Sequence, residues 1–376
     1  MLSIGRVARC LRRTFELQDP LHARLLPMEG LRGVAVTLVF LQHYTVQSQL
    51  IGLSPGAAAT VAAALRSYGN LGVELFFVLS GYLIYGTLVR KAPPFLGFMA
   101  RRIQRIYPAF LVVFSFALAV TLLAPVPHKI PSEPWHAAGY IAVNLALLPG
   151  LVPMVGIVDV AWSLSYEMFF YLVTAGLVLG MGLNRTPPKW RILLIAVLAS
   201  LFVVVSCAGI PNFPLRMMPF FAGMLLAEGL GSRIPAWLGW AAPLAALVAY
   251  LADVMPGVLQ ELTQTVAFFS LCAVCFRDAG VVSRRMTWAP LRWLGNMSYS
   301  YYLVHGFVVR IAMVVLGRVL PSGMPDWVFW GFMPILYLAT LAASALLFVL
   351  VEKPISLRPA ETKVNRLVSV QPAARR

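Results

Sequence analysis

The chain has 376 residues, of which 60% are hydrophobic and 12% are charged, and its mean hydropathy is +0.81. A soluble domain carries roughly a quarter charged residues, so this composition excludes a soluble enzyme or a disordered chain and predicts an integral membrane protein. The 30 Lys and Arg exceed the 14 Asp and Glu, but in a membrane protein this excess is typical of cytoplasmic loops and does not indicate nucleic-acid binding.

The first 27 residues are polar and rich in arginine. No apolar stretch of about 7–15 residues follows directly, so the segment does not fit a secretory signal. A helix lying on the cytoplasmic membrane surface is favoured over a mitochondrial presequence. The sequence therefore predicts three parts: a basic cytoplasmic segment at 1–27, a membrane domain at 28–354 and a basic cytoplasmic tail at 355–376.

Ten apolar runs occupy most of the membrane domain, each long enough, or nearly so, to cross a hydrocarbon core of about 30 Å. Such long runs are typical of helices, whereas a β-barrel would show short alternating segments. We therefore expect an all-α polytopic membrane protein of about ten transmembrane helices. The expected spans are 31–50, 71–90, 106–124, 160–181, 191–209, 215–231, 235–253, 258–277, 296–317 and 328–351.

The distribution of Lys and Arg predicts the orientation of these spans. With ten spans and the N-terminus inside, 25 of the 30 basic residues lie on the inner side. A shorter eleventh run at 137–152 would invert every later loop if it crossed, and the bias would be lost. We therefore predict that both termini are cytoplasmic and that 137–152 is an outer interfacial or re-entrant segment.

Ionisable side chains inside spans are costly, so each is a functional candidate. Arg32 and His43 are eleven residues apart, which places them on one face of the first span, about 16 Å apart. Counting from the span ends places His43, Glu74, Glu167 and His305 at similar depth in the outer half. We predict a shared catalytic site in which a histidine takes a proton from a hydroxyl and a glutamate orients it. Four separate packing contacts are the alternative.

A second cluster lies at the inner membrane surface. Arg102 and Arg105 stand three residues apart at the start of the third span and share a helix face. Together with Arg32 they form a group, here called the inner arginines, that suits phosphate binding, although membrane topology alone also explains them. Glu352 ends the last span at the same surface, and we expect it to form an ion pair with an arginine.

Six motifs follow one another along residues 28–354. They are the Arg-x10-His of the first span, GNLGVELFFVLSGYLI (69–84), RRIQR (101–105), WSLSYE (162–167), SYSYYLVH (298–305) and VEKP (351–354). Together they resemble the acyltransferase-3 family of membrane O-acyltransferases. Glu29 and Glu74 stand where that family usually has Asp, and Tyr82 stands where it usually has Phe.

The resemblance implies transfer of an acyl group, usually acetyl, from cytoplasmic acyl-CoA to a hydroxyl of an extracytoplasmic glycan or similar acceptor. It also implies a bacterial inner membrane. The inner arginines would bind the phosphates of CoA. His43 would act as the base or carry the acyl group transiently, and Glu74 or Glu167 would orient it. Acyl-CoA would be a donor substrate, and no permanently bound cofactor is expected.

A proton-coupled transporter of a small solute is the alternative function, because ten helices with buried His and Glu also describe such a protein. Dependence on acyl-CoA distinguishes the two. No metal site is expected, because Cys272 and Cys275 have no second pair of ligands. The acceptor, the choice between acetyl and succinyl, and the possibility of a homo-oligomer stay open.

Overall fold

The structure is a computed structural model, which describes residues 4–17, 26–67, 71–123, 130–209, 213–251, 257–277, 280–320 and 324–357. The predicted cytoplasmic tail lies outside the described residues from residue 358 onward. Parts of the predicted N-terminal segment, 1–3 and 18–25, also lie outside them.

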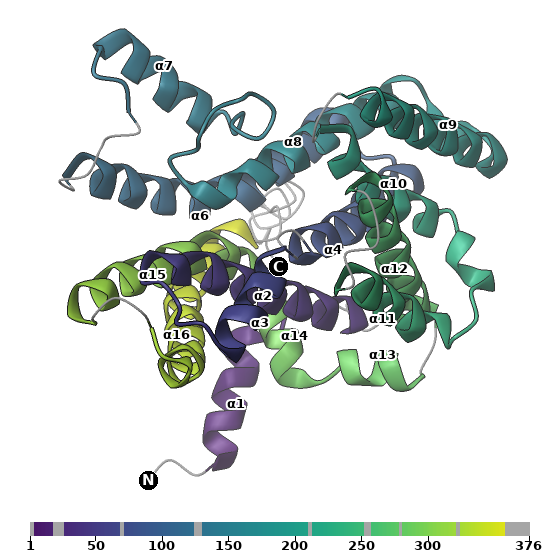
Figure 1. The fold of residues 1–376 in the computed structure, drawn as a ribbon. Coiled ribbons are helices and arrows are strands. Elements are labelled where there is room, and N and C mark those ends of the chain that lie inside the picture. The colour runs from purple at the N-terminus through teal and green to yellow at the C-terminus, as the bar shows by residue number, and fades with distance from the viewer. Residues whose placement is uncertain are drawn as a thin grey trace, which may run out of the picture.

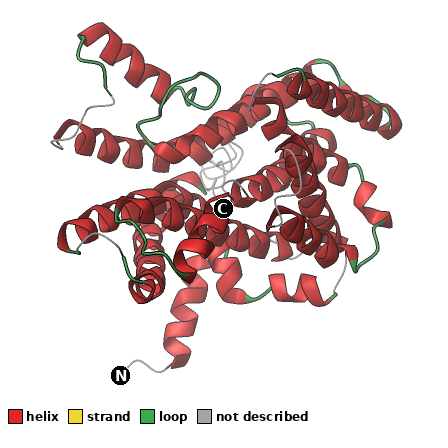
Figure 2. Cartoon of the chain, viewed as in Figure 1, coloured by secondary structure: helices red, strands yellow, loops and turns green. Residues whose placement is uncertain are grey.

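The described part of the chain is almost entirely helical (Figures 1 and 2). Its α-helices are α1 (Ile4–Phe15), α2 (Leu26–Gln47), α3 (Ala57–Ser67), α4 (Leu71–Ser80), α5 (Gly86–Lys91), α6 (Phe95–Leu123), α7 (Pro134–Leu145), α8 (Trp162–Ala175), α9 (Pro188–Cys207), α10 (Phe213–Ala227), α11 (Leu238–Leu251), α12 (Gly257–Arg277), α13 (Val281–Met286), α14 (Ala289–Asn296), α15 (Ser298–Val319) and α16 (Asp326–Leu347). Three π-helical segments interrupt or extend them: η3 (Gly81–Tyr85), η5 (Gly176–Gly180) and η8 (Phe348–Ser356).

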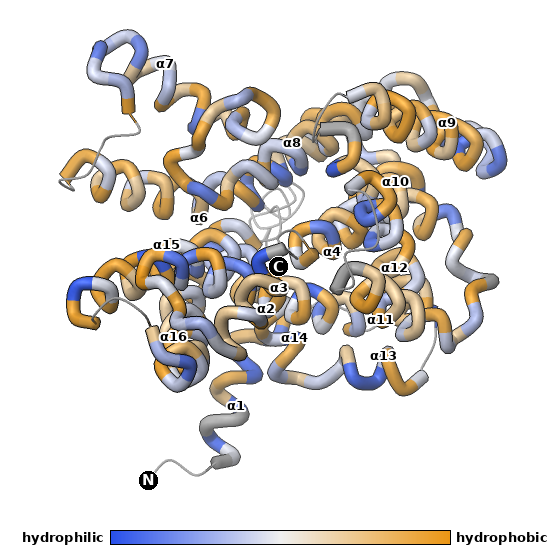
Figure 3. Tube along the Cα trace, viewed as in Figure 1, coloured by the Kyte–Doolittle hydropathy of each residue, from blue (hydrophilic) through white to orange (hydrophobic). Residues whose placement is uncertain are grey.

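Seven of the described helical segments are long and apolar enough to cross a membrane, while apolar stretches of α10 and α11 are shorter. Apolar residues run along the long helices, and α9 is the clearest case (Figure 3). Only 6% of its apolar window is buried inside the protein, so its side chains are placed to contact lipid. The predicted all-helical class is confirmed. Each of the ten expected spans falls on a helical segment, but ten crossings remain a prediction.

Chain segments that the sequence predicts on the same side of the membrane are in contact in the structure. On the predicted inner side, Arg292 of α14 donates to Glu29 of α2 at 2.9 Å and to Glu16, just after α1, at 3.2 Å. On the predicted outer side, the backbone N–H of Met324 donates to the carbonyl of Gly52 at 2.8 Å. This pairing of ends agrees with the predicted topology. The assignment of one side to the cytoplasm stays a prediction.

Helix α7 begins three residues before the eleventh apolar run, ends within it and has 12 residues. Its length is about 18 Å, which is less than the roughly 30 Å hydrocarbon core. The buried side chain of Asn144 accepts a hydrogen bond from the backbone of Ile157 at 2.7 Å and so ties the following loop back to α7. The short helix agrees with the prediction that 137–152 does not cross the membrane.

Helix α2 packs against α13 and α14 at backbone-to-backbone distance, because glycines line the contact. A Cβ atom on Gly295 would lie 1.7 Å from the carbonyl oxygen of Glu29, and one on Gly30 would lie 1.9 Å from that of Met286. No side chain fits such spaces, since the neighbouring atoms are backbone and cannot swing away. These glycines therefore set the position of α2, which carries two of the predicted site residues.

Replacing Gly295 with Ala should destabilise the protein by at least about 3 kcal/mol, the upper part of the usual range for overpacking. Thermal unfolding in detergent measures the loss. Gly331→Ala in α16 is the matched control, because a Cβ there meets nothing within 4 Å. Equal melting temperatures for the two variants would contradict the close contact.

Candidate active site

The three inner arginines line one cavity of about 240 Å³, here called the arginine cavity. Its walls come from α2, α4, η3, α5, α6, α8 and α15, so segments far apart in sequence contribute to it. Its polar lining also includes Ser80, Glu167 and Tyr171. The structure thus brings the inner arginines together, and it adds Glu167 to them.

Arg105 forms an ion pair with Glu352, a fully buried carboxylate in η8. Glu352 also accepts hydrogen bonds from the backbone N–H of Ser300 at 3.0 Å and from its hydroxyl at 2.5 Å. The predicted ion pair of Glu352 is therefore confirmed, with Arg105 as its partner. The charge of Arg105 is balanced by this carboxylate, which ties α6 to the end of the last helix.

Arg32 and Arg102 are held differently. Arg32 donates to the hydroxyl of Ser298 from Nε at 3.1 Å and from Nη2 at 2.8 Å. The guanidinium carbon of Arg102 lies 5.3 Å from the ring centre of Phe98 and 5.6 Å from that of Tyr171. The Nε of Arg102 is buried without a hydrogen-bond partner. Within the described part of the chain, neither arginine forms an ion pair.

Glu167 is the one carboxylate among the described residues that line the arginine cavity. It accepts hydrogen bonds from the hydroxyl of Ser80 at 3.0 Å and from the hydroxyl of Tyr171. Three guanidinium groups therefore face two carboxylates, Glu167 and Glu352, which leaves one excess positive charge. An uncompensated buried cation is costly, so the cavity is suited to an anionic ligand.

His43 and His305 face each other across α2 and α15, with ring centres 4.8 Å apart. His305 is fully buried, and its Nδ1 lies 3.0 Å from the carbonyl oxygen of Tyr301. Because a carbonyl only accepts, Nδ1 carries the proton in that contact, and Nε2 is left buried without a partner. His43 lines a second cavity of about 50 Å³, here called the histidine cavity.

Glu74 lies apart from both cavities. With its amide oriented toward the carboxylate, Gln264 of α12 donates to both oxygens of Glu74 at 3.1 Å. The expected grouping of His43, Glu74, Glu167 and His305 therefore divides into a histidine pair, a glutamate in the arginine cavity and a glutamate of α4 that faces α12. Residue counting gives the depth of a side chain along its helix, but it does not give the neighbour that the side chain faces.

Asp159 was not singled out from the sequence, yet it lines the histidine cavity together with His43. It belongs to the short 3₁₀ turn η4 (Asp159–Ala161) that precedes α8. A carboxylate oxygen of Asp159 lies 3.6 Å from a guanidinium nitrogen of Arg310, and both side chains are about half exposed. The sequence offered one signal for this residue, namely that Asp159 is an acidic residue directly before the fourth apolar run. Because Asp159 precedes the expected span, its position is typical of a surface residue and does not by itself indicate a site.

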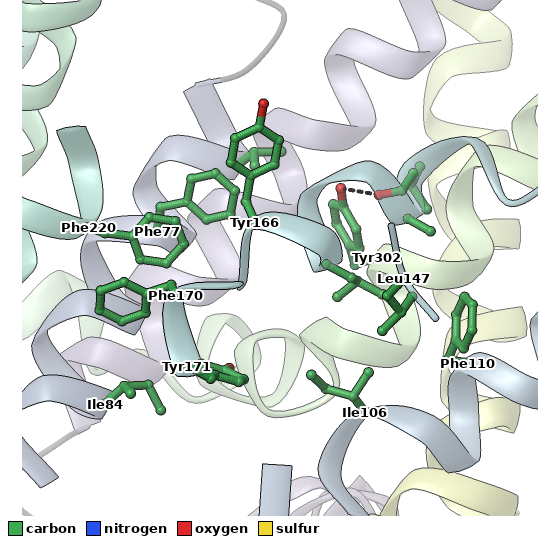
Figure 4. Packing of buried hydrophobic residues seen from close by; sticks show 14 of the residues in the cluster. Phe77, Ile84, Ile106, Phe110, Leu147, Tyr166, Phe170, Tyr171, Phe220 and Tyr302 are labelled. Carbon is green, nitrogen blue, oxygen red and sulfur yellow. Dashed lines mark hydrogen bonds between the residues drawn. The ribbon is translucent and has the colours of Figure 1, made fainter. Parts of the chain in front are cut away.

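A hydrogen-bonded layer separates the two cavities. The hydroxyl of Tyr302 donates to the carbonyl of Val160 at 2.8 Å (dashed line in Figure 4) and lies 2.7 Å from the hydroxyl of Ser163. Tyr302 and Ser163 line the arginine cavity, whereas Val160 and Leu303 line the histidine cavity. Only the turn at the start of α8 and one turn of α15 therefore stand between them.

The Arg105–Glu352 pair predicts non-additive stability changes. Glu352→Ala should destabilise the protein by about 3 kcal/mol, the lower end of the range for a buried pair, because it leaves the partly buried guanidinium of Arg105 without its partner. Removing both side chains should cost less than the sum of the two single replacements. Thermal unfolding of the two single variants and the double variant measures the coupling. Strict additivity would contradict a paired charge.

Comparisons with known proteins identify the family of the chain. Residues 27–349 match the sequence model of an acyltransferase domain. The chain is 27% identical over 330 residues to acyltransferase MdmB of Streptomyces mycarofaciens, which covers 79% of this chain and 82% of that protein. It is 27% identical over 281 residues to exopolysaccharide production protein ExoZ of Rhizobium meliloti, covering 69% and 83%.

A third relative is the putative peptidoglycan O-acetyltransferase YrhL of Bacillus subtilis. It is 27% identical over 387 residues, covering 89% of this chain and 55% of that protein. No solved structure matches the chain. Because the domain match spans most of its length, the protein belongs to the acyltransferase-3 family and is an acyltransferase.

Proposed function

We propose that the protein is a bacterial inner-membrane O-acyltransferase. It takes an acyl group, acetyl or succinyl, from cytoplasmic acyl-CoA and transfers it to a hydroxyl of an extracytoplasmic glycan or similar acceptor. The observation that carries this proposal is the excess positive charge of the arginine cavity, which fits an anionic donor. The names of the relatives, a peptidoglycan O-acetyltransferase and an exopolysaccharide production protein, support an acetyl donor and a glycan acceptor.

The donor is assigned to the arginine cavity. Arg102 and Arg32 have no carboxylate partner there, so their guanidinium groups are available for the phosphates and polar arm of CoA. Helix α2 runs without interruption from Arg32 to His43, a rise of about 16 Å. A thioester arm that enters beside Arg32 therefore extends along α2 toward the histidine pair.

His43 is proposed to act on the acceptor hydroxyl. As a base it takes the hydroxyl proton, the oxygen attacks the thioester carbonyl, the C–S bond breaks, and the proton passes to the CoA sulfur. The alternative route, in which His43 first carries the acyl group, uses the same contacts. His305 positions the His43 ring. The orienting carboxylate expected from Glu74 or Glu167 is reassigned to Asp159, and Glu167 is assigned to the donor side.

The two substrates meet only if the Tyr302–Ser163 layer opens, because the arginine cavity and the histidine cavity lie on its two sides. The histidine cavity of about 50 Å³ has room for a hydroxyl and its carbon, since a water molecule takes roughly 30 Å³. A sugar ring would stay at the mouth, beside Asp159 and Arg310. The small size of the histidine cavity supports an acceptor that inserts a single hydroxyl group while the rest of the molecule stays outside.

His43→Ala should abolish acyl transfer while leaving donor binding within about twofold of wild type, because His43 does not line the arginine cavity. CoA release and donor binding are measured on the same detergent-purified samples with acetyl-CoA and succinyl-CoA. His305→Ala should lower the turnover number and leave donor affinity unchanged. Near-normal transfer by His43→Ala would rule out the proposed base.

Arg102→Ala should weaken donor binding by roughly 10–100-fold, as expected for losing about 1.5–3 kcal/mol from a charged hydrogen bond. Arg101→Ala is the matched control, because Arg101 is exposed and does not line the cavity. Equal donor affinities for the two variants would place CoA elsewhere. Failure of wild type to bind either donor would return the transporter alternative to consideration.

A further inference from the structure

A groove of about 610 Å³ opens outside the arginine cavity and has no role in the mechanism above. The turn Ala92–Phe95 forms one wall, and η5 with the residues that follow it forms the other. Its volume falls within the roughly 300–1,000 Å³ that is typical of small-molecule sites.

The same three parts of the chain line both the groove and the arginine cavity, at successive positions: α5 with the turn after it, α6, and α8 with η5. The groove residues stand a few positions from those of the arginine cavity: Ala92 follows Thr87 of α5, Phe95 precedes Arg102 in α6, and Gly176 of η5 follows Tyr171 of α8. The offsets of five to seven residues correspond to about 8–10 Å along a helix. A ligand longer than the arginine cavity therefore extends into the groove.

Basic residues are in excess around the groove, where Arg191 and Arg105 are balanced by Glu228 and Glu352 from other parts of the chain. Segments 86–105 and 176–191, which form the groove and the adjoining arginines, contain eight Lys and Arg and no Asp or Glu. Lys91 and Arg185 are exposed at this surface, and Arg185 lines the groove itself. A surface of this kind attracts and holds a phosphorylated ligand.

Two glycines leave the wall of the groove open. A Cβ atom on Gly176 or on Gly180 would meet nothing within 4 Å, and both residues have helical backbone. Opposite them, Ala92 has a φ of 40° and precedes two prolines, which fix the turn. The ring of Phe95 is 37% exposed at the same edge. These features form a rigid, shallow slot for a flat ring.

We propose that this groove binds the adenosine 3′-phosphate part of CoA. The adenine lies between the glycine wall and Phe95, the 3′-phosphate pairs with Arg185, and the diphosphate reaches Arg102. The pantetheine arm then occupies the arginine cavity. This inference rests on the proposed acyl-CoA donor and adds to it the site of the nucleotide, which was not expected from the sequence motifs.

The test separates the two halves of CoA. Purified full-length protein in detergent is titrated with acetyl-CoA, with adenosine 3′,5′-bisphosphate and with S-acetylpantetheine, which lacks the nucleotide. Gly180→Leu fills the groove, and Arg185→Glu reverses its charge. Gly331→Leu is the control, because it places the same side chain in open space on α16.

Wild type and the control should bind acetyl-CoA, and the bisphosphate should displace it. Both groove variants should bind acetyl-CoA at least about tenfold more weakly and lose this competition, because they lose phosphate pairing or ring contact. Their affinity for S-acetylpantetheine should stay unchanged, which shows that the arginine cavity is intact.

Wild-type affinity for acetyl-CoA in both groove variants would overturn the nucleotide site while leaving the proposed donor in place. Wild-type protein that binds neither acetyl-CoA nor S-acetylpantetheine would overturn the donor itself. The two failures are therefore distinguishable.

Discussion

A charge inside a membrane protein needs an opposite charge or a polar ligand, because water does not solvate it there. The arrangement around the arginine cavity follows from this constraint. Glu352, fully buried at the end of the last helix, balances Arg105, while Arg32 and Arg102 share the cavity with one further carboxylate, Glu167. The balanced arginine ties α6 to the last helix, and the one excess positive charge that remains favours an anionic ligand.

Helix α2 connects the arginine cavity, which favours an anion, to the histidine pair, where the acyl transfer is proposed to occur. It is held against α13 and α14 by glycine contacts that admit no side chain, so the positions of Arg32 and His43 are set by backbone packing. One end of the same face reaches the arginine cavity and the other reaches the histidine pair. The hydrogen-bonded Tyr302–Ser163 layer lies between the two cavities, so the proposed donor and acceptor meet only if it opens.

The donor side is larger than the arginine cavity alone. The helices that carry its polar residues continue to a second, glycine-walled groove with basic residues at its edge, and we propose that a long, segmented donor occupies both. The histidine cavity, in contrast, is small and has the Asp159–Arg310 pair at its mouth. Binding a large donor on one side and a single hydroxyl on the other suits acyl transfer across a membrane.

The sequence alone was sufficient for the helical class, because long apolar runs have one stable arrangement in a bilayer. It also placed Arg32 and His43 on one face, since helical periodicity within one element is independent of its neighbours, and it anticipated an arginine partner for Glu352. The motifs predicted the acyltransferase-3 family, which the domain match confirms.

Only the tertiary structure decided which side chains meet. Glu74 faces Gln264, Glu167 faces Ser80 and Tyr171, and Asp159 lines the same cavity as His43. These contacts depend on the rotation and tilt of each helix against its neighbours. Side-chain packing between helices sets both, and the position of a residue within its own helix contains no information about either.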